Sequence, residues 1–191
     1  MPNWVTNYLT VKKEVADKYI LNDKKEVDFE ILLPMPEELR DTISPCPSDE
    51  ELEKKYGASN WYDWSIKNWG CKWNASMCDI EEVGDDDEVR LTFDTPWTTP
   101  DRWLNKLIEM NIGFHLAWYE EQGYRGIMIY EENYDDRFDF VTEFDLPDVE
   151  WIEDENGDYY GSDEKEPFDW RDLTYEGEYE EWMKQWENKK A

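Results

Sequence analysis

Hydrophobic and polar residues alternate along several short segments of the chain, which is the period of a β-strand with one buried face. The first such segment follows the N-terminus and is rich in β-branched and aromatic residues. The turn Gly84-Asp85-Asp86-Asp87 lies between two others and predicts a hairpin. In all, the pattern predicts strands over Trp4 to Val11, Val27 to Leu33, Met77 to Val83, Glu88 to Phe93, Ile112 to Tyr119 and Tyr124 to Tyr130.

Helix signals occupy the segments between these strands. Prolines and acidic residues mark first turns, and glycines mark the ends. Helices are predicted at Pro36-Glu37-Glu38, from Ser48 to Gly57, from Trp61 to Trp69 and from Pro100 to Met110. The last of these is amphipathic, because Trp103, Leu104, Leu107 and Ile108 fall on one face. Helices mixed with antiparallel strands predict the α+β class.

The composition adds an extreme negative charge to this pattern. Forty-nine Asp and Glu against 20 Lys and Arg give 191 residues a formal net charge of −29. Of this, −17 falls in residues 131–191, which hold 23 acidic and 6 basic residues. Such charge repels nucleic acid and anionic membranes and favours a basic partner. An aromatic content of 16%, with 12 Trp and 12 Tyr, opposes disorder and predicts a folded chain.

Signals for export, membrane insertion or disulfide bonding are not evident in the sequence. The start at Met1 lacks a basic flank followed by an apolar segment, and no apolar run approaches the roughly 20 residues of a membrane span. Cys46, Cys71 and Cys78 are odd in number and contain no Cys-x-x-Cys, so reduced thiols are expected. These observations predict a cytoplasmic protein.

Several short motifs follow one another along the chain in a characteristic order. They are Met1-Pro2-Asn3-Trp4, Asn7-Tyr8-Leu9-Thr10-Val11, Leu33-Pro34-Met35-Pro36-Glu37-Glu38-Leu39, Trp61-Tyr62-Asp63-Trp64, Asn68-Trp69-Gly70-Cys71-Lys72-Trp73-Asn74-Ala75, Phe93-Asp94-Thr95-Pro96-Trp97 and the stretch from Trp118 to Gly126. In this order they resemble the uncharacterised Api92-like family of phage and plasmid proteins. The resemblance covers about residues 1 to 135 and implies a ferredoxin-like fold and a mobile-element origin, but no catalytic residues.

Together, pattern and resemblance predict two parts. Residues 1–140 are expected to form a ferredoxin-like α+β domain, an antiparallel sheet with helices on one face. Residues 141–191 are expected to form an acidic, aromatic-rich extension outside the resemblance. Within it, Asn156-Gly157 predicts a hairpin turn, and Trp182, Met183 and Trp186 lie at helical spacing within Glu178 to Lys190.

Trp61, Trp64, Trp69 and Trp73 allow two interpretations. Aromatic faces stack on the bases of single-stranded nucleic acid when a basic groove surrounds them, but only two lysines lie between Trp61 and Ala75. We therefore expect these rings to fill the core. The only histidine, His115, alternates with apolar neighbours and is predicted to lie half-exposed on the opposite face of its strand.

The many carboxylates could in principle bind a metal ion or act as a general acid and base. The run from Ile152 to Asp163 nearly fits a calcium loop, but Ile152 stands at the first ligand position and Asp163 replaces the final Glu. A hairpin is the favoured interpretation. No Gly-x-Ser-x-Gly, Walker loop or His-Glu-x-x-His is present, so no catalytic residue, metal site or cofactor is predicted.

The remaining function is an interaction through the acidic surface. We expect a non-catalytic protein of a mobile element that inhibits a basic, nucleic-acid-binding host defence protein, a nuclease or CRISPR-type effector, by mimicking DNA or RNA in the host cytoplasm. The alternatives are a carboxylate-rich enzyme or metal-dependent module, and an acidic accessory domain whose charge only prevents association. The predicted partner-binding residues are Asp154, Glu155, Asp158, Asp163 and Glu164 in the extension and Asp85, Asp86, Asp87 and Glu88 in the hairpin turn.

Overall fold

The computed structural model describes most of the first 143 residues and two short strands beyond them. The described residues are 3–45, 47, 49–83, 87–122, 124–132, 138–143, 151–153 and 159–161. The chain divides into two compact units, Met1–Thr142 and Glu143–Ala191.

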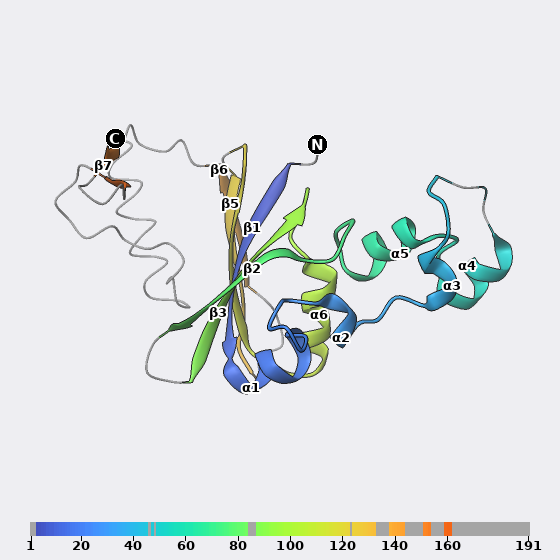
Figure 1. The fold of residues 1–191 in the computed structure, drawn as a ribbon, viewed down its shortest axis with the longest axis horizontal. Helices are drawn as coiled ribbons and strands as arrows, with labels where there is room; N and C mark the ends of the chain where they lie inside the picture. The colour runs from blue at the N-terminus through green and yellow to red at the C-terminus, as the bar shows by residue number, and fades with distance from the viewer. Residues whose placement is uncertain are drawn as a thin grey trace. The chain divides into compact units, whose positions relative to one another are not determined.

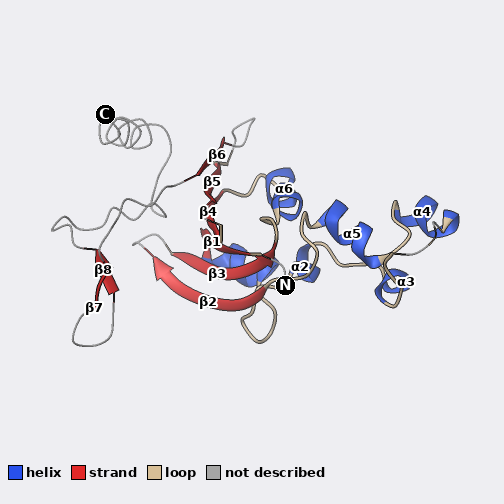
Figure 2. Ribbon diagram, turned by 90° about the horizontal axis from the view of Figure 1, so that it is seen from above, coloured by secondary structure: helices blue, strands red, loops and turns tan. Residues whose placement is uncertain are grey.

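The first unit is built around one β-sheet. Its strands are β1 (Trp4–Lys12), β2 (Ser76–Val83), β3 (Glu88–Pro96), β4 (Phe114–Glu120), β5 (Tyr124–Tyr130) and β6 (Phe138–Glu143). They lie side by side in the order β2-β3-β1-β4-β5-β6 (Figure 1 and Figure 2). Because β1 pairs antiparallel with both β3 and β4, the first strand of the chain lies inside the sheet.

Two interlocked crossovers define the topology. β1 and β2 run parallel, since each pairs antiparallel with β3 between them. β3 and β4 likewise run parallel on either side of β1, and α6 (Asp101–Glu109) connects them. The succession β1, helices, β2, β3, α6 and β4 is the β-α-β-β-α-β arrangement of a ferredoxin-like fold. The predicted α+β class is confirmed.

The helices of this unit are short. Besides α6 they are α1 (Lys13–Val15), the π-helical turn η1 (Ala16–Ile20), α2 (Phe29–Leu32), α3 (Glu37–Arg40), α4 (Glu50–Tyr56) and α5 (Trp61–Asn68). Viewed from above, α2 and α6 lie on the same side of the sheet, and α3 to α5 lie farther out (Figure 2). The four helices predicted between residues 36 and 110 are present as α3, α4, α5 and α6.

The core lies between this side of the sheet and the helices. Alternate residues of β1, from Val5 to Val11, are buried, and the residues between them are partly exposed. Phe29 of α2 packs against Trp103 of α6 and Phe93 of β3, with ring centroids 4.9 and 6.0 Å apart. Large aromatic rings thus supply much of the apolar area that holds α2 and α6 on the sheet.

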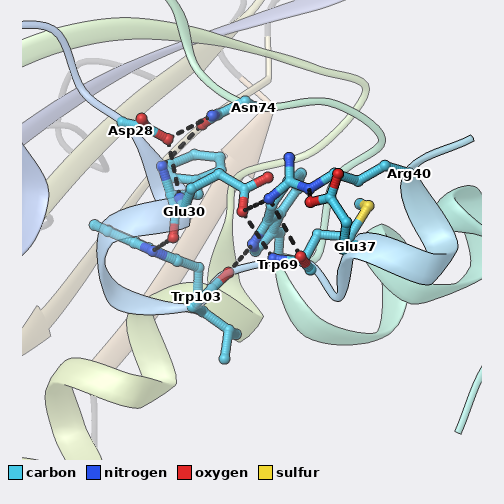
Figure 3. Close-up of polar contacts among 10 residues, drawn as sticks. Asp28, Glu30, Glu37, Arg40, Trp69, Asn74 and Trp103 are labelled. Carbon is cyan, nitrogen blue, oxygen red and sulfur yellow. Dashed lines mark hydrogen bonds and ion pairs between the residues drawn. The ribbon is translucent and has the colours of Figure 1, made fainter. Parts of the chain in front are cut away.

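The predicted strand over Val27 to Leu33 is wrong, because α2 begins at Phe29. The Asp28 carboxylate caps this helix by accepting hydrogen bonds from the backbone N–H of Glu30 and from the amide of Asn74 (Figure 3). Asn74 Oδ1 in turn accepts a bond from the backbone N–H of Phe29 at 2.8 Å. These side chains bind backbone donors that a strand would present to its neighbour, so the apolar segment becomes a helix.

The four tryptophans predicted to fill the core differ in burial. Trp64 and Trp69 are only 5% and 3% exposed, and their rings meet edge to face 5.4 Å apart. Trp69 Nε1 also donates to Leu33 O at 2.9 Å. The prediction is confirmed for these two, and Trp61 is partly buried. It is wrong for Trp73, which is 39% exposed because its ring lies against Trp4 and Trp97 and not in the core cluster.

In the second unit, the described residues form a hairpin. β7 (Trp151–Glu153) pairs antiparallel with β8 (Tyr159–Gly161). The turn predicted at Asn156-Gly157, most positions of the calcium-like loop and the helix predicted within Glu178 to Lys190 lie outside the described residues.

Candidate functional site

Strand β2 forms an edge of the sheet and carries exposed carboxylates. It begins the strand order, so among the described strands only β3 pairs with it. Asp79, Glu81 and Glu82 are exposed along it, and Asp87 and Glu88 follow at the turn into β3. We call these five residues the acidic edge. Charged side chains on an edge strand discourage pairing with another sheet and leave the carboxylates available to a partner of opposite charge.

The acidic edge presents carboxylates on both faces of the sheet. Side chains alternate along a strand, so Asp79 and Glu81 share the face away from the helices and Glu82 lies on the other. Glu81 is paired in register with Arg90, and its Oε2 lies 3.8 Å from Arg90 Nη1. Because the Arg90 side chain is largely buried while that of Glu81 is 63% exposed, the carboxylate faces solvent.

Glu82 links the acidic edge to the start of the first helix. Its Oε1 accepts a hydrogen bond of 2.7 Å from Lys13 Nζ. This bond lowers the pKa of Glu82 and raises the pKa of Lys13, so both groups are charged at neutral pH. The backbone N–H of Lys13 also donates to Asp87 O at 2.9 Å, which fixes the end of the β2–β3 hairpin against β1.

The predicted site residues in the hairpin turn are partly described. Asp87 is exposed with φ +58°, and Glu88 is half-buried and pairs in register with Val83 and Lys12. The structure therefore brings Asp87 and Glu88 to the same end of the sheet as the carboxylates of β2. Asp85 and Asp86, and the extension residues Asp154, Glu155, Asp158, Asp163 and Glu164, lie outside the described residues.

Arg40 is an example of a cation that pairs with carboxylates of the same unit. Its Nη2 donates to Glu30 Oε2 at 2.8 Å and to Met35 O at 3.2 Å, and its Nε lies 3.1 Å from Glu37 Oε2 (Figure 3). The bond to Glu30 raises the pKa of Arg40. This network joins α2 to α3, so the charge of Arg40 is already compensated and does not offset the acidic edge.

The described thiols and histidine have structural surroundings. Burial raises the pKa of the Cys71 thiol to about 12, and burial also raises the pKa of Cys78. Cys78 borders a polar cleft of about 250 Å³. His115 is half-buried and lies on the face opposite Phe114 and Leu116, as predicted. Among the described residues, no three His, Cys, Asp or Glu side chains are grouped as metal ligands would be.

The sequence did not single out Asp79, Glu81 and Glu82. Their acidic character was visible within the predicted strand, but their position on an edge depends on β1. That strand comes from the start of the chain and occupies the other side of β3, which leaves β2 outermost. The sequence did carry one signal for an edge strand. This segment, which is predicted to be a strand with one buried face, contains an excess of acidic residues.

The fold and its acidic edge define a ferredoxin-like α+β protein with a strongly anionic surface. Residues 72–166 match the family model described as a ferredoxin-like domain in Api92-like protein. The chain thus belongs to the Api92-like family, and the resemblance inferred from its motifs is confirmed. No curated protein and no solved structure matches it.

The extent of the match differs from the expected resemblance at both ends. It begins after β1, so the strand that pairs with both β3 and β4 comes from outside the matched segment. It ends at residue 166, and it therefore includes much of the acidic segment that we expected to lie outside the family. That expectation was wrong for residues 141–166, which include β7 and β8.

The helices that the structure describes are short. In the part of the chain that the structure describes, none of them combines the length and apolar character required to cross a bilayer.

Proposed function

We propose that this protein binds a basic, nucleic-acid-binding host protein and competes with its nucleic acid for the same surface. The observation that carries the proposal is the acidic edge, an outermost strand and its turn with carboxylates on both faces of the sheet. Consecutive side chains on one face of a strand are about 7 Å apart. Asp79 and Glu81 therefore form a short row of charges that Arg and Lys side chains can contact.

The overall charge supports the same partner chemistry. A formal net charge of −29 attracts basic surfaces over several ångströms and accelerates their association at low salt. Channels that bind DNA or RNA are strongly basic, so a nuclease or a CRISPR-type effector is a natural target for an anti-defence protein of a phage or plasmid. The inhibitor would act by occupancy, without turnover, in the cytoplasm of the host cell.

The proposal is tested by capture and competition. The full-length protein is immobilised and incubated with host lysate at low salt, and bound proteins are eluted with duplex or single-stranded oligonucleotides and identified by mass spectrometry. We expect elution of basic nucleic-acid-binding proteins, and the same release by increasing salt, because screening weakens contacts between charges. Captured proteins that nucleic acid does not displace would contradict the proposal.

A matched pair of variants locates the interface. Asp79→Asn, Glu81→Gln and Glu82→Gln together remove three charges from the acidic edge. Asp23→Asn, Glu50→Gln and Glu51→Gln remove the same three charges from exposed positions elsewhere. We expect the first variant to weaken capture more than the control.

A third variant tests the predicted sites of the extension. It reverses the charge of Asp154, Glu155, Asp158, Asp163 and Glu164, after thermal melting has shown that it remains folded. If this variant alone loses the partner, the interface is in the extension. If the acidic-edge variant and its matched control lose the partner equally, only total charge matters.

A further inference from the structure

In the first unit, two exposed and two half-buried aromatic rings lie near one lysine. Trp73 lies 6.3 Å from Trp4 and 6.4 Å from Trp97 between ring centroids, and the planes of Trp73 and Trp97 differ by only 26°. Trp73 and Trp97 are 39% and 45% exposed. Lys72 Nζ lies 4.3, 5.0 and 5.9 Å from the ring centroids of Trp73, Trp97 and Tyr62. We call these five residues the aromatic patch.

The backbone holds Trp97 in an unfavourable conformation. Its φ is +69°, in the left-handed region that large side chains rarely adopt. The turn is fixed on both sides, because Trp97 N donates to Asn3 O at 2.8 Å and Thr98 N donates to Pro96 O at 2.9 Å. The strained turn keeps a large apolar ring exposed, where the ring adds nothing to the core. Backbone strain of this kind is typical of binding sites.

The charges around the patch indicate what it binds. Three indoles and a phenol present electron-rich faces, and a cation already lies over three of these rings. Asp94 is paired in register with Thr6, two pairs along the sheet from Trp4, and accepts a hydrogen bond of 2.9 Å from the Thr6 hydroxyl. Its carboxylate therefore lies on the same face as Trp4, about 7 Å along the strand. A polyanion would be repelled by a chain of charge −29, whereas a cation is attracted.

We propose that the aromatic patch receives an arginine side chain of the basic partner, and that Lys72 occupies this cation position until the partner binds. This inference rests on the proposed function. A planar guanidinium stacks on aromatic rings better than an ammonium and is more weakly hydrated, so arginine displaces Lys72 and gains a carboxylate at Asp94. The acidic edge supplies long-range attraction, and the patch supplies a buried anchor of the kind that dominates interfaces.

The test compares two peptides of equal charge, tetra-arginine and tetra-lysine, by calorimetry on the full-length protein. We expect tetra-arginine to bind about two- to fivefold more tightly. Trp73→Ala and Trp97→Ala should abolish this preference, and Trp97→Tyr should retain part of it. Met77→Ala, which removes an 80% exposed apolar side chain outside the patch, should leave the preference unchanged.

Lys72→Ala gives the most specific outcome. If Lys72 only adds a favourable contact or a structural role, its removal weakens binding or has no effect. If Lys72 competes with the incoming arginine, its removal strengthens the binding of tetra-arginine more than the binding of tetra-lysine. The gain for tetra-lysine measures the effect of removing one positive charge. A gain that is equal for both peptides overturns the competition.

The peptides also separate this inference from the proposed function. Equal binding of tetra-arginine and tetra-lysine, unaffected by Trp73→Ala, overturns the arginine site and leaves the charge-based function intact. If neither peptide binds at low salt, both the arginine site and the proposed function are contradicted.

Discussion

Asn7 donates a hydrogen bond of 2.8 Å from Nδ2 to Oγ1 of Thr95 across β1 and β3, and both residues are fully buried. The same amide also donates to the backbone carbonyls of Val5 and Phe93. Thr95 Oγ1 in turn donates to Thr98 O at 2.7 Å, which supports the turn that carries the exposed Trp97 ring. A polar side chain at a core position thus anchors the surface turn.

Asn7→Ala should lower the free energy of unfolding by about 1–3 kcal/mol, because it leaves buried acceptors without their donor. Urea unfolding measures this change. Thr92→Ala, at a partly exposed position of β3, is the control and should change stability by about 0.5 kcal/mol or less. Equal stability of Asn7→Ala and the wild type would show that this hydrogen-bond network does not stabilise the sheet.

Trp69 and Trp73 allow a comparison of core and surface tryptophans. Trp69→Ala should destabilise the protein by about 3–5 kcal/mol, since the ring is buried against Phe29 and Trp64. Trp69→Phe keeps an aromatic ring but removes the donor to Leu33 O, so part of this loss should remain. Trp73→Ala should change stability by about 1 kcal/mol or less. Denaturation monitored by circular dichroism gives all three values, and similar losses at Trp69 and Trp73 would contradict the assignment.

The sheet was largely predictable because its signals are local. Alternation identified β1, β2, β3, β4 and β5, and β5 even has the predicted bounds. The segment around Phe29 failed because its conformation is decided by Asn74, 45 residues away, whose side chain binds the helix N-terminus. The helical turns at Lys13–Val15 and Ala16–Ile20 were not predicted, since each is too short to show a helical period.

The positions of the candidate sites depend even more strongly on contacts between residues that are far apart in the sequence. Carboxylates can be counted in a sequence, but whether Asp79 lies on an edge follows only from the strand order. The aromatic patch joins Trp4, Trp73 and Trp97 from three distant segments, and no spacing within any one segment reveals it. The sequence predicts a buried Trp73, because a ring near Trp64 and Trp69 is usually part of the core.

Cys71 and Cys78 should differ in reactivity toward iodoacetamide. Cys71 is 1% exposed, and burial raises its pKa to about 12, so it has almost no thiolate at pH 8. Cys78 is half-buried and borders the polar cleft, so it should be alkylated slowly in the folded protein. Peptide mapping by mass spectrometry distinguishes the two, with the urea-unfolded chain as the control in which both react. Early alkylation of Cys71 would mean that its core position is wrong.

The raised pKa of Cys71 also predicts the direction of a pH effect on stability. The unfolded thiol loses its proton near pH 9, whereas the folded thiol keeps it until about pH 12. The contribution of Cys71 is therefore fully present below pH 9 and decreases as pH rises from 9 to 12. Unfolding free energies of the wild type and Cys71→Ala should converge over this interval.

Glu38 provides the corresponding test on the acidic side. Hydrogen bonds from Lys55, whose Nζ lies 2.6 Å from Glu38 Oε1, and from the Tyr56 hydroxyl lower the pKa of Glu38 to about 2. Nuclear magnetic resonance of the side-chain carboxyl at pH 4 should show an ionised Glu38. Lys55→Met should raise its pKa toward the ordinary value of 4.5 and leave it partly protonated there, whereas Lys54→Met, which alters an adjacent lysine, should not.

The sign of the effect on folding follows from the lowered pKa of Glu38. The stability that its hydrogen bonds contribute is fully present above pH 4.5 and is lost as pH falls toward 2, because the unfolded carboxyl is protonated first. The stability difference between the wild type and Lys55→Met should therefore shrink on acidification below pH 4.5. Both groups are largely exposed, so the difference should also decrease in high salt. A Glu38 that is half-protonated at pH 4.5 in the wild type would show that α3 and α4 are not joined by this pair in solution.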